Sequence, residues 1–204
     1  MLEVVNLSCA RGDRPLFRDL SFRLNPGELL HLQGANGSGK TTLLRTLCGL
    51  SRPAAGEIHW QGKPVSEDES DFRAALCYIG HNNALHGDLT GSENLHFEAC
   101  LTGSPGDGAQ SALDDIGLAR VAGLPTKLLS QGQKRRTALA RLLLQDKPLW
   151  VLDEPLTALD IRSAAALLGL FSRHLERGGL IILTSHQELS LIDRPVLTLV
   201  LEST

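Results

Sequence analysis

Short apolar runs alternate with amphipathic segments along most of the chain. The apolar stretches 149–154, 180–185 and 196–201 predict buried strands, because strands that are covered on both faces carry few polar residues. Helical patterns begin near Ser130 and Asp160, ahead of the first two of these strands. Strands that alternate with helices favour a largely parallel α/β sheet.

The first half of the chain adds alternating segments separated by turns. Alternation over 16–24 predicts a strand, which 25-NPG-27 turns into a second strand over 28–33, in the manner of a hairpin. The same patterns predict a helix over 40–50 and strands over 57–62 and 76–80. From Thr90 the chain is predicted to be helical, because 90-TGSE-93 has the form of a capping box. A glycine-rich loop at 103–108 interrupts that region.

Composition is typical of an ordinary globular protein. At 204 residues the chain is long enough for one domain with a sizeable core. A net charge of -3 provides no basic field, so we expect no nucleic-acid partner. The four cysteines are scattered without a C-x-x-C pair, which indicates reduced thiols rather than a disulfide scaffold or a zinc site. No apolar run approaches the ~20 residues that cross a bilayer, so a membrane role is expected to come through a partner.

The segment 34-GANGSGKT-41 fits the phosphate-loop pattern G-x-x-x-x-G-K-[ST] at every position. Its glycines permit turns in which backbone N–H groups surround phosphate oxygens. Lys40 is expected to reach the β- and γ-phosphates, and the Thr41 hydroxyl to ligate Mg²⁺. The expected nucleotide contacts are Gly34, Ala35, Asn36, Gly37, Ser38, Gly39, Lys40, Thr41 and Thr42. A strand before the loop and a helix after it distinguish this motif from an ordinary glycine-rich turn.

Two acidic residues at the end of an apolar strand are predicted to complete the nucleotide site. In 149-LWVLDEP-155, Asp153 is placed to hold Mg²⁺ through water, and Glu154 to act as a general base on an attacking water. His186 follows the strand 180–185 and is expected at the same edge of the sheet, near the γ-phosphate. A lone histidine after a strand is more often an ordinary loop residue, so this assignment depends on the neighbouring site.

The stretch 128-LLSQGQKRR-136 opens a helix with three cations, although a helix N-terminus already carries partial positive charge. Ser130 and Gln133 form a capping box there. Capping leaves the cations unexplained, together with Gly132, which costs ~1 kcal/mol relative to alanine inside a helix. A phosphate bound at this helix end would account for both features. The pattern therefore favours an anion site over capping alone.

Together these motifs resemble the ATP-binding subunits of ABC transporters, over essentially the whole chain. LSQGQ resembles that family's LSGGQ signature, LDEP its catalytic strand, 157-TALD-160 its D-loop and TSH its switch histidine. The resemblance implies an α/β fold with a P-loop NTPase sheet core, an N-terminal antiparallel β subdomain and a helical subdomain at about 90–146, within one ATP-binding domain over 2–204. It also implies an ATPase with ATP and Mg²⁺ as cofactors.

By the same resemblance, two copies of the chain would sandwich two ATP molecules head to tail. Each phosphate loop would then face Ser130, Gly132 and Gln133 of the other copy, with Asp160 at the seam. The anion expected at the signature helix would be the γ-phosphate of the ATP that the second copy binds. The residues implied to be catalytic are Lys40, Glu154 and His186.

Three positions depart from the family pattern. Gln131 replaces the first glycine of the signature. Arg11 stands where an aromatic residue usually stacks on adenine, and because a guanidinium can also stack on a base, Arg11 is expected to bind there. His81, with Asn82 beside it, stands where the family has the glutamine of its Q-loop. Mg²⁺ prefers oxygen ligands, so histidine is a poor replacement.

Within the family, the segments 43–65, 78–97 and 184-TSHQ-187 resemble the ATP-binding components of bacterial haem exporters used in cytochrome c maturation. This implies a peripheral protein on the cytoplasmic face of the inner membrane, bound to integral membrane transporter subunits, that drives haem delivery to a periplasmic chaperone. The alternatives are the ATPase of another small ABC exporter, or a soluble ABC ATPase in assembly or nucleic-acid work. The scattered histidines and Cys77 form no C-x-x-C-H and no evident axial pair, so no haem site is expected.

Overall fold

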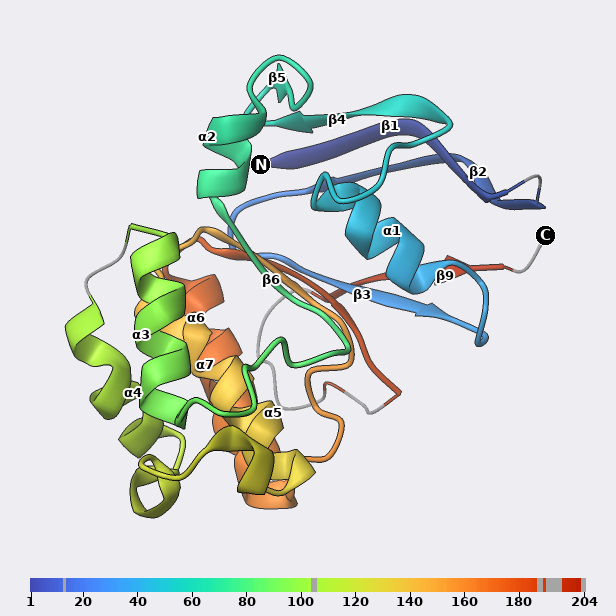
Figure 1. The fold of residues 1–204 in the computed structure, drawn as a ribbon. Coiled ribbons are helices and arrows are strands. Elements are labelled where there is room, and N and C mark those ends of the chain that lie inside the picture. Colours follow the sequence, from blue (N-terminus) through green and yellow to red (C-terminus); the bar gives the residue numbers. More distant parts are fainter. Residues whose placement is uncertain (13, 104–105, 187–188, 190–195, 203–204) are drawn as a thin grey trace.

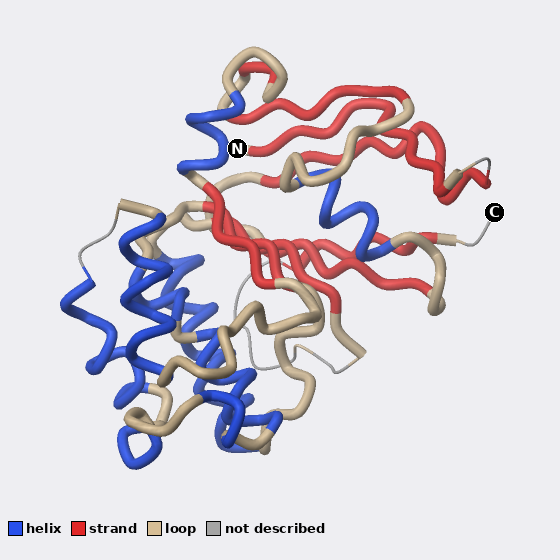
Figure 2. Tube along the Cα trace, viewed as in Figure 1, coloured by secondary structure: helices blue, strands red, loops and turns tan. Residues whose placement is uncertain are grey.

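The computed structural model describes residues 1–204 except 13, 104–105, 187–188, 190–195 and 203–204. Its strands form two sheets (Figures 1 and 2), an antiparallel one in the order β2-β1-β4-β5 and a parallel one in the order β6-β7-β8-β3-β9. The strands are β1 (Leu2–Arg11), β2 (Arg14–Leu24), β3 (Leu29–Gly34), β4 (Ala55–Trp60), β5 (Lys63–Pro64), β6 (Leu76–Ile79), β7 (Leu149–Leu152), β8 (Leu180–Thr184) and β9 (Val196–Leu201). The predicted parallel α/β sheet is therefore confirmed.

The strands predicted over 16–24 and 28–33 do not pair with each other as a hairpin. The turn 25–27 joins β2 to β3, but β2 pairs with β1, whereas β3 pairs with β8 and β9. The reason lies in burial. The residues Leu29–Leu32 are all buried, while β2 exposes much of one face. A strand without a polar face fits the inside of a covered parallel sheet, so the chain crosses from one sheet to the other at this turn.

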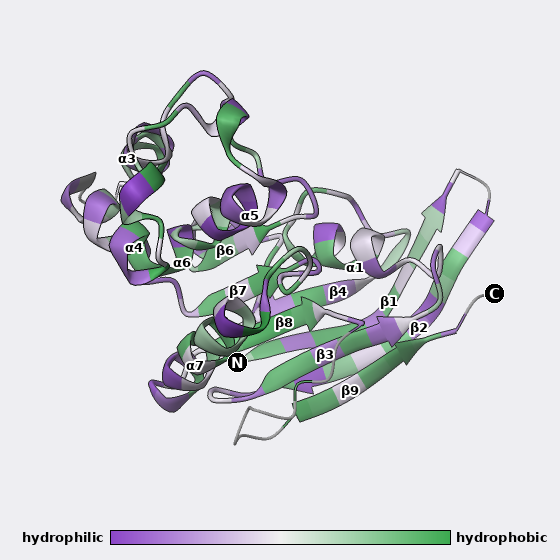
Figure 3. Cartoon of the chain, turned by 90° about the horizontal axis from the view of Figure 1, so that it is seen from below, coloured by the Kyte–Doolittle hydropathy of each residue, from purple (hydrophilic) through white to green (hydrophobic). Residues whose placement is uncertain are grey.

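The parallel sheet has a hydrophobic core on each face. Leu149 and Val151 of β7 point into the core that contains α1 (Lys40–Leu47) and the antiparallel sheet. Trp150 and Leu152 point into the opposite core, which α7 (Ile161–Glu176) covers. In Figure 1, α1 lies between the two sheets, and Figure 3 shows how apolar β7 and β8 are. The central strands of the parallel sheet are therefore covered on both faces.

Four of the remaining helices form a group beside the parallel sheet, at the lower left of Figure 1. This helical group consists of α3 (Gly91–Leu101), α4 (Ala109–Asp115), α5 (Gln131–Leu139) and α6 (Arg141–Leu144). The described chain also has α2 (Glu69–Ala74) and the short 3₁₀ turns Gly106–Gly108, Ala119–Val121 and Thr126–Leu128. The group has its own small core, rich in alanine, which includes Leu95 and Leu113. The capping box predicted at Thr90 is confirmed, because Thr90 and Glu93 bond each other's backbone N–H.

Candidate active site

A cleft of about 460 Å³ lies where β3, β7 and β8 end. Parallel sheets commonly bind ligands at this edge. The lining residues are Arg11, Leu16, Asn36, Gly37, Gly39, Lys40, Thr41, Thr42, His81, Asp153, Glu154, Thr157 and His186. The structure thus brings most of the sequence-predicted residues together. Gly34, Ala35 and Ser38 belong to the same loop but do not line the cleft, and neither do Ser130, Gly132, Gln133 and Asp160.

The loop between β3 and α1 has the backbone that its glycines predict. Gly34 has a φ of 145°, and a Cβ there would lie 2.5 Å from the carbonyl oxygen of Leu201. Gly39 caps α1 with a φ of 102° and offers no side-chain hydrogen bond to the helix. The first N–H groups of α1 therefore lack a side-chain cap, which is the arrangement of an anion-binding helix end. The hydroxyl of Ser38 is buried and has no hydrogen-bond partner among the described residues.

The ammonium of Lys40 folds back over this loop. Its Nζ donates to the carbonyl oxygens of Gly34 at 2.6 Å and Ala35 at 3.0 Å. A lysine ammonium has three N–H groups, so one donor is left for a ligand in the cleft. The charge is therefore held against the phosphate loop, beside the cleft.

Asp153 is the centre of a hydrogen-bond network at the cleft. Its Oδ2 accepts from the hydroxyl of Thr41 at 3.0 Å, and its Oδ1 accepts from the hydroxyl of Thr184 at 2.7 Å. The carboxylate is 3% exposed, and these bonds compensate part of the cost of burying it. Thr184 also accepts from the backbone N–H of Glu154 at 2.8 Å. The network therefore links α1, β7 and β8.

Glu154 has an unusual backbone conformation. Its φ is 51°, in the left-handed region that non-glycine residues rarely adopt and that often occurs at functional sites. Its Oε1 lies 3.5 Å from Nε2 of His186, and its Oε2 accepts from the Thr157 hydroxyl at 3.5 Å. The strained turn directs the carboxylate into the cleft, where the exposed His186 also lies. The structure thus places two of the three predicted catalytic residues, Glu154 and His186, in contact.

The signature-like segment begins α5, outside the cleft. The predicted capping box is confirmed: the Ser130 hydroxyl accepts from the N–H of Gln133 at 3.2 Å, and the Ser130 N–H donates to Oε1 of Gln133 at 2.8 Å. Gln131 is exposed in the first turn, and nothing in the structure explains its replacement of glycine.

The three cations that follow have partners inside the same chain. Lys134 donates to the carbonyl oxygen of Lys127, and Arg136 to that of Ile116. Arg135 is buried and donates to carbonyl oxygens at the ends of β6 and β7. The cations therefore need no bound anion to explain them, contrary to the sequence argument.

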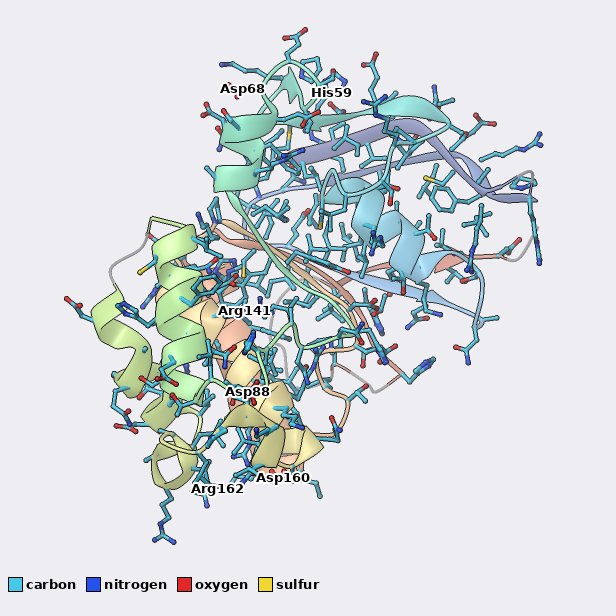
Figure 4. The ribbon with its side chains drawn as sticks, in the orientation of Figure 1. His59, Asp68, Asp88, Arg141, Asp160 and Arg162 are labelled. Atoms are coloured by element: carbon cyan, nitrogen blue, oxygen red, sulfur yellow. The ribbon has the colours of Figure 1, made fainter. Side chains whose placement is uncertain are left out.

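Gly132 also has a structural reason within the chain. A Cβ at this position would lie 2.6 Å from the carbonyl oxygen of Ala158, so only glycine lets the segment after β7 approach α5 this closely. Asp160 follows in that segment and caps α7, where its Oδ1 accepts from the N–H of Ser163 at 2.7 Å. This hydrogen bond holds the pKa of Asp160 below its usual value. Figure 4 shows Asp160 near the start of α5.

Several residues at the site make contacts that were not predicted from the sequence. Thr184 and Thr157 bond the two acidic residues, and Arg135 joins the strand ends. The signal for Thr184 was available, because Thr184 is the first residue of the switch motif 184-TSH-186. Of the positions that depart from the family pattern, Arg11 and His81 line the cleft, whereas Asn82 does not. Among the described residues, no group of three or more histidine, cysteine, aspartate or glutamate side chains could hold a metal ion by itself.

Comparison with known proteins identifies the relatives of the chain. A model of the ABC transporter family matches residues 17–157. The cytochrome c biogenesis ATP-binding export protein CcmA of Dechloromonas aromatica is 52% identical over 193 residues, covering 94% of this chain and 95% of the relative. The CcmA protein of Pseudomonas aeruginosa is equally similar, with 52% identity over 193 residues and the same coverage.

The structural comparison agrees. A putative ABC transporter ATP-binding protein from Pyrococcus furiosus has a TM-score of 0.84 and 28% identity, covering 100% of this chain and 99% of that one. No helix in the described part of the chain has the length and apolar character needed to cross a membrane.

Proposed function

The chain belongs to the ABC transporter family, and within it to the cytochrome c biogenesis ATP-binding export proteins, and from this membership we propose that it hydrolyses ATP to power haem export, or the release of haem to its chaperone, in cytochrome c biogenesis. The observation that carries the proposal is the cleft that unites Lys40, Thr41, Asp153 and Glu154. A phosphate-binding loop beside two acidic strand-end residues has the parts that ATP hydrolysis requires.

The phosphate loop would bind the nucleotide. The uncapped N–H groups of α1 and the ammonium of Lys40 provide positive charge for the β- and γ-phosphates. The unpartnered hydroxyl of Ser38 provides a further polar group in the same loop. Arg11, at the end of β1, would stack on the adenine.

The residues beside the loop suit Mg²⁺. Thr41 and Asp153 place two oxygen atoms 3.0 Å apart, and oxygen is the ligand that Mg²⁺ prefers. Asp153 would act through water, and when bound the ion would supply neutralisation of phosphate charge. His81 has no such oxygen, so we assign it no metal.

Glu154 would act on the attacking water as a general base. Its strained turn holds the carboxylate in the cleft, and Thr157 and His186 contact its two oxygens. His186 would orient this carboxylate and contact the γ-phosphate. Proton transfer of this kind is worth about 10²–10⁴-fold in rate.

A second copy of the chain would complete the site. Ser130, Gly132 and Gln133 do not line the cleft of their own chain, yet the start of α5 matches the signature at every position except Gln131. We propose a head-to-tail homodimer on ATP binding, in which the start of α5 faces the phosphates held by the other copy and Asp160 lies at the seam. Integral membrane transporter subunits would bind this dimer as a peripheral complex on the cytoplasmic face of the bacterial inner membrane.

A Glu154→Gln variant tests the catalytic assignment. We expect hydrolysis to fall by about 10²–10⁴-fold with ATP binding retained, so that ATP-bound dimers accumulate and are seen by size-exclusion chromatography. Glu67→Gln, which changes an exposed acid away from the cleft, is the matched control and should hydrolyse ATP normally. Hydrolysis at the wild-type rate by the Glu154 variant would refute the assignment.

The haem assignment needs a cellular test. In cells that lack their own relative of this chain, the wild-type protein should restore haem attachment to cytochrome c, and the Glu154→Gln variant should not. An active ATPase that associates with membranes but fails to restore attachment would contradict the haem role while leaving the ATPase role intact. Recovery of the protein only in the soluble fraction, in cells that contain the membrane subunits, would favour the soluble alternative.

A further inference from the structure

Arg135 is a buried cation in α5, one of the helices of the helical group. The residue is 4% exposed, and its side chain extends from α5 toward the edge of the parallel sheet. Burial lowers the pKa of its guanidinium, while the neighbouring Asp153 and Glu154 oppose that shift. Burying a charged group is costly unless it is hydrogen-bonded, so its contacts should identify its role.

Those contacts lie at the ends of two neighbouring strands. Nη2 donates to the carbonyl oxygen of Asp153 at 2.6 Å, immediately after β7. Nη1 donates to the carbonyl oxygen of Gly80 at 2.9 Å, immediately after β6, and to Oδ1 of Asn83 at 3.2 Å. One side chain therefore joins α5 to the strand end that carries the two acidic residues, and to the loop that contains His81.

A second contact joins the same parts of the chain. The backbone of Gly132 in the first turn of α5 packs against the carbonyl oxygen of Ala158, which follows Glu154 by four residues. Arg135 lies one helical turn further along α5. The start of α5 is thus tied to the segment after β7 at two points, one of which depends on packing and one on charged hydrogen bonds.

We propose that Arg135 is a positioning residue that holds the start of α5 in register with the Asp153–Glu154 strand end. The inference rests on the proposed function, in which these two parts of one chain serve different nucleotides of a dimer. Asp153 and Glu154 act on the ATP in their own cleft, and the start of α5 faces the ATP of the other copy. Arg135 then couples the two nucleotide sites through a rigid contact within each chain.

The buried Arg141 provides a matched comparison. It is 7% exposed, and it donates to the carbonyl oxygen of Ala138 at 3.0 Å and to Glu98 at 3.4 Å. Both partners lie within the helical group, where Figure 4 labels Arg141. Loss of either guanidinium removes a buried cation and its hydrogen bonds, but only Arg135 contacts the strand ends.

The experiment compares Arg135→Gln, Arg135→Lys and Arg141→Gln in the purified full-length chain. We expect Arg135→Gln to bind MgATP within about twofold of the wild type, because it leaves the phosphate loop intact, while kcat falls by about 10–100-fold through misplacement of catalytic groups. Arg135→Lys keeps the charge but not the forked geometry, and should give an intermediate kcat. Arg141→Gln should lower the melting temperature, with kcat of the folded protein near that of the wild type.

Two results would overturn the inference. One is an Arg135→Gln variant whose MgATP affinity falls while its kcat stays at the wild-type value. The other is a kcat that does not distinguish the Arg135 variants from Arg141→Gln. If Arg135→Gln does not fold, the same criteria apply to Arg135→Lys. A wild-type chain without ATPase activity would instead contradict the proposed function, so the two failures are distinguishable.

Discussion

The starts of α1 and α5 both carry features of a phosphate-binding helix end, but they are built differently. The first N–H groups of α1 have no side-chain cap, and Gly39 brings them to a cleft with Lys40 and Asp153. The start of α5 is capped by its own Ser130 and Gln133, lies outside that cleft, and is followed by cations that bond carbonyl oxygens of the same chain.

Under the proposed function, the difference separates the half of the nucleotide site that one chain completes from the half that a second copy would supply. The α1 half has its loop, ammonium and acidic residues in place within a single copy. The α5 half has a capped start in contact with the segment after β7, but it does not line the cleft. Such a preformed surface is suited to a ligand that another molecule holds, which is the basis of the proposed dimer.

The largest expected effect comes from breaking the α1 half. Lys40→Ala removes the ammonium above the loop, and loss of a single preorganised donor typically costs about 10²–10³-fold in rate. We expect ATP binding and hydrolysis both to fall, measured by nucleotide titration and phosphate release. Lys63→Ala, in β5 and away from the cleft, is the control. If Lys40→Ala hydrolysed ATP as fast as Lys63→Ala, the start of α1 could not be distinguished from the start of α5 as the phosphate-binding end.

A moderate effect is expected at the close contact of α5. In Gly132→Ala, the added Cβ would lie 2.6 Å from the carbonyl oxygen of Ala158, and such overpacking costs about 1–3 kcal/mol. Thermal unfolding should report the loss, and hydrolysis should fall while ATP binding persists. Gly123→Ala is the control, because a Cβ there meets no atom within 4 Å. Normal stability in Gly132→Ala would show that the contact has no energetic importance.

The smallest effect separates capping from function. Ser130→Ala and Thr90→Ala each remove one capping box, at a cost of about 1 kcal/mol or roughly 2–4 °C in melting temperature. We expect similar thermal shifts in both variants, but a lower ATPase rate only for Ser130→Ala. Equal ATPase rates would mean that Ser130 acts purely as a cap.

The sequence predicts the cleft well because its residues follow features that are local. The phosphate loop, the two acidic residues and His186 each come directly after an apolar strand, and parallel strands end at one edge. The capping boxes are equally local, since each joins residues three positions apart. Such features need no knowledge of the rest of the fold.

Features that depend on distant parts of the chain were predicted poorly. The partners of Arg135 lie 55 and 18 positions away, so its charge was attributed to a bound anion instead. The contact of Gly132 with Ala158 is of the same kind. The strand β1 was not predicted from the sequence at all. It has register shifts against both of its neighbours, and such shifts interrupt the alternation of apolar and polar residues by which a strand is recognised.

The central claim is that each ATP is hydrolysed between the phosphate loop of one copy and the start of α5 of the other. Mixing Lys40→Ala chains with Ser130→Arg chains tests it most directly, because only a mixed dimer contains one site with both halves intact. For random pairing and independent sites, an equal mixture should regain about a quarter of the wild-type ATPase rate.

The control mixture pairs Lys40→Ala with Glu154→Gln chains. Both residues line one cleft, so each site of a mixed dimer keeps one defect and no activity should return. Rescue in the first mixture and none in the second is the result the account predicts. Failure of the first mixture, or equal rescue in both, would contradict it.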